Sequence, residues 1–63
     1  MQRYRIISHG RVLQSSKYTF FAIIFDREKG TYFREEVQDC STFDEFLQVL
    51  KNKLRAEVEV KRR

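Results

Sequence analysis

The sequence predicts a small α+β fold: a small antiparallel β-sheet, built around a β-hairpin, with one amphipathic helix packed on one face. Several short segments are rich in aromatic and β-branched residues, as strands are, and one later segment has helical spacing of its apolar residues instead. The chain has 63 residues, two glycines and no proline, so residues 1–63 form a single domain without a linker. The expected element order is β(β)ββαβ, in which the bracketed strand is short and is left open.

The N-terminal segment, residues 3–8, alternates in the manner of a strand and places Tyr4 and Ile6 on one face. The His-Gly pair at 9–10 is the expected turn, because glycine adopts a positive φ at little cost. Residues 11–14 either pair back as a short second strand or continue as loop.

The central segment is expected to be a β-hairpin. Residues 18–25 are dominated by aromatic and β-branched side chains and are too short for a convincing helix. The stretch DREKG then provides a turn with Gly30 at the position that tolerates left-handed geometry, so residues 31–37 should return antiparallel.

One helix is expected from the segment STFDEFLQVLKNKL. Thr42 is a good N-cap, and Glu45 three positions later completes a capping box. An apolar stripe on this helix should lie on the sheet; it comprises Phe43, Phe46, Leu47, Leu50 and Leu54. Residues 56–60 then switch to a period of two and are expected to form a last strand, whose position in the sheet is left open.

Charge is unevenly distributed along this basic chain, which has a net charge of +4. Residues 1–17 carry four cations and no acid, residues 18–46 carry seven acids against three cations, and residues 47–63 carry six cations against two acids. A basic balance favours an anionic partner, and the basic ends are the better candidates for phosphate contacts. The competing interpretation is that these charges solvate edge strands and discourage aggregation.

Chemistry that needs a cluster of special side chains is not expected. Cys40 and His9 are the single cysteine and the single histidine, so neither an internal disulfide nor a tetrahedral metal site can form. There is no glycine-rich phosphate loop, no evident third group to orient a Cys/His pair, and no long apolar run. We therefore expect a non-enzymatic protein without metal or cofactor, not associated with a membrane, that is intracellular and cytoplasmic, and nucleoid-associated if it binds DNA.

The strand at 18–25 is apolar on both faces. One set of alternate residues is Phe21, Ile23 and Phe25, and the other is Phe20, Ala22 and Ile24. If the helix covers the first set, the second needs another cover. A dimer interface, a docking surface for a protein partner, an apolar wedge for a DNA minor groove, and the N-terminal segment folded over this face are the alternatives.

Five features follow one another at compatible spacings: Asp26 at a strand end, Gly30 in a turn, Arg34 on the next strand, Val37 after it, and the helical run EFLQVL at 45–50. With these features, residues 20–54 resemble the C-terminal part of the seven-kilodalton chromatin proteins of thermophilic archaea.

That resemblance implies an SH3-like barrel capped by a helix, whose triple-stranded sheet lies in the DNA minor groove. By the same resemblance, Phe20, Ala22, Ile24 and Arg34 occupy the binding face. Glu36 is expected to share the face of Arg34, because the two are two positions apart on a strand.

The leading hypothesis is a small basic nucleic-acid-binding protein, with duplex DNA bound at little sequence preference. The candidate binding residues are Arg3, Arg5, Arg11, Lys17, Phe20, Ala22, Ile24, Arg34, Lys61, Arg62 and Arg63. The alternative is a viral or plasmid-type protein-binding or inhibitor module, or a homodimer, that uses the exposed apolar face of the central strand.

Overall fold

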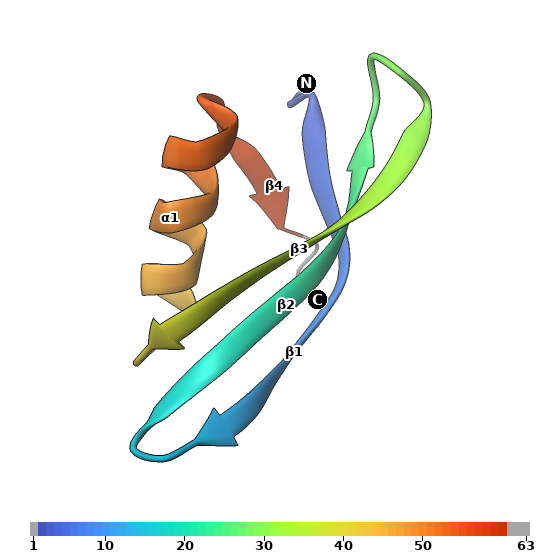
Figure 1. Ribbon diagram of the computed structural model, residues 1–63. Helices are drawn as coiled ribbons and strands as arrows, with labels where there is room; N and C mark the ends of the chain where they lie inside the picture. The colour runs from blue at the N-terminus through green and yellow to red at the C-terminus, as the bar shows by residue number, and fades with distance from the viewer. Residues whose placement is uncertain (1, 61–63) are drawn as a thin grey trace.

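The computed structural model describes residues 2–60, which form one sheet and one helix. The elements are β1 (Tyr4–Gln14), β2 (Lys17–Asp26), β3 (Thr31–Cys40), α1 (Phe43–Leu54) and β4 (Val58–Val60). The sheet has the strand order β3-β2-β1-β4, and α1 lies across one of its faces (Figure 1). The predicted α+β fold class is confirmed.

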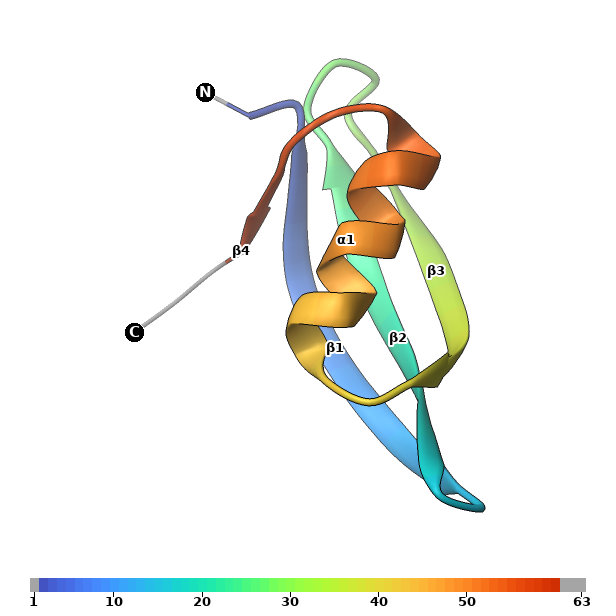
Figure 2. The same ribbon diagram turned by 90° about the vertical axis from the view of Figure 1, so that its left-hand side faces the viewer.

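The sheet is mixed, because β4 runs parallel to its neighbour β1 whereas the other neighbouring strands are antiparallel. The β1, β2 and β3 strands form an antiparallel meander, and β4 pairs parallel with β1 over Tyr4–Ile6. The chain reaches this edge by way of α1, which carries it back along the sheet before β4 begins (Figure 2). With β3 and β4 as its two edges, the sheet of residues 2–60 is open, whereas the resemblance implied an SH3-like barrel.

The first strand runs without interruption through the predicted turn at His9 and Gly10. Gly10 lies opposite Phe21 in the β1–β2 ladder, and a Cβ atom on Gly10 would lie 2.6 Å from Cζ of Phe21. This glycine therefore makes room for an aromatic ring on the neighbouring strand instead of turning the chain. The turn lies at residues 15–16, where Ser15 adopts a φ of 59°.

The predicted central hairpin is confirmed, and Asp26 organises its turn. The N–H of Gly30, at φ 67°, donates to the backbone oxygen of Asp26 at 2.7 Å. The Asp26 carboxylate also accepts from the N–H groups of Glu28 at 3.0 Å and Lys29 at 3.2 Å. Three backbone donors in the turn are thereby satisfied by one residue.

Helix α1 begins where its cap predicted. The N–H of Glu45 donates to Oγ1 of Thr42 at 3.2 Å, and the Glu45 carboxylate in return accepts from the N–H of Ser41 at 3.3 Å. At its other end Arg55 adopts a left-handed conformation, φ 56°, and the N–H of Ala56 bonds back to the oxygen of Lys51. The predicted stripe lies on the sheet, with Phe46, Leu47 and Leu50 buried and Phe43 and Leu54 partly buried against them.

Helix α1 does not cover the face of β2 that carries Phe21, Ile23 and Phe25, as considered from the sequence. It covers the other face of this strand. Phe20, Ala22 and Ile24 are 2%, 0% and 0% exposed in the core beneath α1, so the prediction that they form an exposed binding face is wrong. Apolar residues on both faces of β2 left the choice open, and the β3 register decides it. A helix on the other face would have to cover both Arg34 and Glu36, whereas on the observed face the single Glu35 pairs with Lys53 of α1 at 2.7 Å.

Candidate nucleic-acid interface

The face of the sheet turned away from α1 carries a mixture of apolar and charged side chains, and we call it the helix-free face. It comprises Arg5, Phe21, Ile23, Phe25, Tyr32, Arg34, Glu36 and Glu59. Tyr32 is 65% exposed, and its ring centroid lies 4.8 Å from that of Phe25. Phe21, Ile23 and Phe25 are half-buried, and within residues 2–60 no second layer covers them, because α1 lies on the other face of the sheet (Figure 1).

Cations on the helix-free face are paired with acids from the same face. The guanidinium of Arg34 lies 5.3 Å from the ring centroid of Phe21 and 3.3 Å from the carboxylate of Glu36. Glu36 thus shares the face of Arg34, as expected. On the same face but toward the β1–β4 edge, Nε of Arg5 lies 4.0 Å from the carboxylate of Glu59. Arg27 also donates to the Glu59 carboxylate at 2.9 Å, so arginines engage both acids of this face, and this pairing weakens the attraction of the face for a polyanion.

Arg3 holds the turn of the β2–β3 hairpin. Its Nε and a terminal nitrogen each donate to an oxygen of the Asp26 carboxylate, both at 3.1 Å, and a further nitrogen lies 3.4 Å from Glu28. The hydrogen bonds from Arg3 hold the pKa of Asp26 below its ordinary value, although desolvation acts in the opposite direction. A phosphate could bind Arg3 only by displacing the Asp26 carboxylate, to which Arg3 donates two hydrogen bonds. This geometry gives Arg3 a structural role.

The β1–β2 hairpin runs alongside the start of α1 and the end of β3, where Tyr18 pairs with Cys40, and only its tip near the turn at residues 15–16 extends past both (Figures 1 and 2). We call residues 9–20 the distal hairpin. Arg11 and Lys17 lie on it, with no carboxylate anywhere between residues 4 and 25. Neither cation makes an ion pair within residues 2–60; the Arg11 guanidinium lies 4.7 Å from the ring centroid of Tyr18. No acid of residues 2–60 therefore offsets the positive charge of Arg11 and Lys17.

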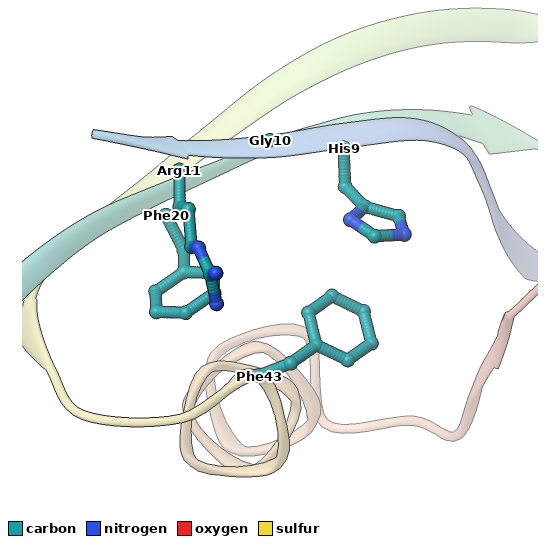
Figure 3. Close-up of a pocket in the computed structure, with 5 residues that line it drawn as sticks. All are labelled: His9, Gly10, Arg11, Phe20 and Phe43. Atoms are coloured by element: carbon teal, nitrogen blue, oxygen red, sulfur yellow. The ribbon is translucent and has the colours of Figure 1, made fainter. Parts of the chain in front are cut away.

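A pocket of about 270 Å³ lies where the distal hairpin meets the start of α1 (Figure 3). It is lined by His9, Gly10, Arg11, Phe20 and Phe43. The rings of His9 and Phe43 have centroids 4.5 Å apart and form one wall, while Arg11 points toward the same cavity from the hairpin. Sequence reasoning did not find this grouping, because only the strand register and the helix position bring these residues together.

The candidate residues therefore separate into groups. Arg11 and Lys17 come together on the distal hairpin, whereas Arg3, Arg5 and Arg34 lie elsewhere in ion pairs. The basic residues predicted at 61–63 lie outside the described residues.

Other chemistry has little support in the described chain. Among residues 2–60, no group of three or more His, Cys, Asp and Glu residues could hold a metal ion. Cys40 is buried, and burial raises the pKa of its thiol, so it is not a reactive thiolate. The one helix described is too short to cross a bilayer.

Comparison of this chain with protein-family models, curated proteins and solved structures finds no match to any of them.

Proposed function

We propose that this protein binds nucleic acid through its distal hairpin. The observation that carries the proposal is the β1–β2 hairpin, with Arg11 beside the start of α1 and Lys17 next to the projecting turn, two cations that no acid of residues 2–60 neutralises. Unpaired cations on a protruding element can approach phosphates without first losing a protein carboxylate.

The shape of the hairpin suits the groove of a duplex. Arg11 pairs with Phe20 on the helix side of the sheet, whereas Lys17 pairs with Gln14 on the other side, so the ribbon has positive charge on both faces. A two-stranded ribbon fits the DNA major groove, which is about 12 Å wide, with phosphates along both walls. Exposed Val12 and Leu13 add apolar contact without a base-specific hydrogen bond. Duplex DNA bound with little sequence preference fits this surface best.

A titration of a fluorescently labelled 20-base-pair duplex, monitored by anisotropy at two salt concentrations, tests the proposal. We expect the affinity to fall steeply as salt rises, because phosphate contacts release counterions. The variant with both Arg11→Glu and Lys17→Glu should bind about tenfold or more weakly on every duplex sequence tried.

The matched control reverses the charge of two cations that lie outside the distal hairpin. Lys29 is exposed in the β2–β3 turn, at the end of the sheet away from the distal hairpin. Lys29→Glu, made in combination with Arg55→Glu on the exposed C-cap of α1, changes the net charge as much as the hairpin variant. Equal weakening by both double variants would show only a net-charge effect, and the absence of salt-sensitive binding would refute the proposal.

A further inference from the structure

The pocket between the distal hairpin and α1 combines aromatic rings with a positive charge. His9 and Phe43 form one wall, Phe20 lies across the cavity from Phe43, and Arg11 reaches in from β1 (Figure 3). None of the five lining residues is acidic. Binding of a duplex by the distal hairpin uses Arg11 but gives His9 and Phe43 no role, so it does not account for this pocket.

The lining side chains suit a planar ring that carries an anionic group. A simple anion would use the guanidinium of Arg11 but gain nothing from the rings, and an apolar ligand would cover the charge of Arg11 without pairing it. An aromatic ligand with a phosphate group uses both, because rings stack on aromatic side chains and one guanidinium donates two hydrogen bonds to a phosphate. The acids next to Phe43 on α1 are Asp44 and Glu45, and neither lines the pocket.

The size of the pocket limits the ligand to one nucleotide unit. Pockets for drug-sized ligands have volumes of about 300–1,000 Å³. At about 270 Å³ this pocket is smaller, and it suits a single ring system with its phosphate. A base inside a duplex is stacked and paired, and it reaches a side pocket only after it leaves the stack. The matching ligand is therefore a nucleotide whose base is unpaired.

Both walls of the pocket are held in place by residues behind them. The guanidinium of Arg11 lies 4.7 Å from the ring centroid of Tyr18, which holds it beside the cavity. The ring centroid of Phe43 lies 5.9 Å from that of Phe46, a fully buried residue of the core. Side chains that are already placed lose less conformational entropy when a ligand binds. The pocket is thus prepared for its ligand by contacts within the chain.

We propose that this pocket binds one unpaired nucleotide, with the base against the wall of His9 and Phe43 and the phosphate at the guanidinium of Arg11. Arg11 belongs to both the pocket and the distal hairpin, so the choice of nucleic acid as the source of the nucleotide rests on the proposed function. A free mononucleotide has the same chemistry. In DNA, the pocket gives the protein a preference for duplexes that contain an unpaired base.

Two labelled duplexes that differ by one unpaired adenine in the middle of one strand test the site in DNA. In anisotropy titrations we expect the bulged duplex to bind about tenfold more tightly, because stacking on an aromatic side chain favours the extruded base. Phe43→Leu removes a ring of the wall but keeps an apolar side chain against the core, so this preference should be lost. The matched control is Phe33→Leu, at a half-buried ring that contacts Tyr4 and does not line the pocket, and it should keep the preference.

A titration with deoxyadenosine monophosphate, followed by NMR on the isotope-labelled full chain, tests the same site without a polymer. We expect the backbone amide signals of Gly10 and Phe43 to shift at millimolar ligand, to shift less with deoxyadenosine, and to shift least with inorganic phosphate. Arg11→Gln should reduce the response to deoxyadenosine monophosphate toward that to deoxyadenosine, because it removes the partner of the phosphate.

A second variant keeps the test decisive if Phe43→Leu fails to fold, as judged by circular dichroism. His9→Ala changes an exposed residue and removes the other ring of the wall, so it should also abolish the preference for the bulged duplex. A preference that survives in every folded variant of the wall would overturn the proposal. The absence of both a bulge preference and a response to deoxyadenosine monophosphate would overturn it too.

The two titrations also separate the source of the nucleotide. A bulge preference without a response to the mononucleotide assigns the pocket to nucleic acid, and a response without a bulge preference assigns it to a free nucleotide. Salt-sensitive duplex binding that makes no use of the pocket leaves the proposed function standing. Pocket signals that respond to deoxyadenosine monophosphate in a protein that binds no duplex would refute only the proposed function.

Discussion

The two faces of the sheet differ far more in environment than in the residues that β2 supplies to them. Phe20, Ala22 and Ile24 are almost fully buried under α1, while the neighbouring residues on the other face are only half-buried. The helix-covered face gains layers of aromatic contact, including the stacked rings of Phe20 and Phe46 at 5.5 Å. Burial is therefore decided by what the adjoining strands and the helix bring to each face, and not by hydrophobicity along β2 alone.

The largest expected effect compares identical substitutions at adjacent positions of β2. Ile24→Ala opens a cavity under α1 and should cost about 2–5 kcal/mol of the free energy of unfolding, whereas Ile23→Ala on the helix-free face should cost about 1 kcal/mol. Urea denaturation followed by circular dichroism measures both. Equal losses would contradict the difference between the faces.

A smaller effect is expected at Gly10, over which the ring of Phe21 lies on the helix-free face. Gly10→Ala places a methyl group against the ring of Phe21, which can shift outward, so we expect a loss of about 1 kcal/mol in the free energy of unfolding. In a Phe21→Ala background the same change should cost little, because the obstructing ring is gone. A double-mutant cycle by chemical denaturation checks this coupling; additive losses would speak against it.

The smallest expected effect is a change in the pH dependence of stability, caused by the ion pair between Arg3 and Asp26 at the β2–β3 turn. Because the folded-state pKa of Asp26 is lowered by Arg3, its contribution to stability is fully present above the ordinary aspartate pKa of about 4 and is lost as pH falls through the lower folded-state value. Acid unfolding followed by circular dichroism should therefore be less pH-dependent in Asp26→Asn. Glu57→Gln, at an exposed carboxylate before β4, serves as control and should keep the wild-type profile.

Local patterns predicted most of the elements. The capping signal at Thr42, the helical stripe and the turn with Gly30 all act over a few residues, and each element they predicted is present. Gly10 was misinterpreted because a glycine that opens a turn and one that admits a neighbouring ring look alike in a sequence. The difference lies in Phe21, a residue eleven positions away that reaches Gly10 only through strand pairing.

The candidate site was less predictable because it depends on register. Arg11 and Lys17 could be selected from charge alone, and the structure leaves them unpaired within residues 2–60. Phe20 was misplaced because β2 is apolar on both faces, so only its pairing with Val37 and the position of α1 show which face is covered. His9 and Phe43 became neighbours through contacts that no sequence spacing encodes.

The parallel pairing of β4 with β1 bears on the order in which the chain folds. The meander and the hairpin turns close over short stretches of chain, whereas Tyr4 meets Val58 only after almost the whole sequence is in place. Closing so long a loop costs more conformational entropy and is slower than closing a hairpin. Docking of Val58 into the core is thus expected to be a late step, and until then the outer edge of β1 is open to pairing with another chain.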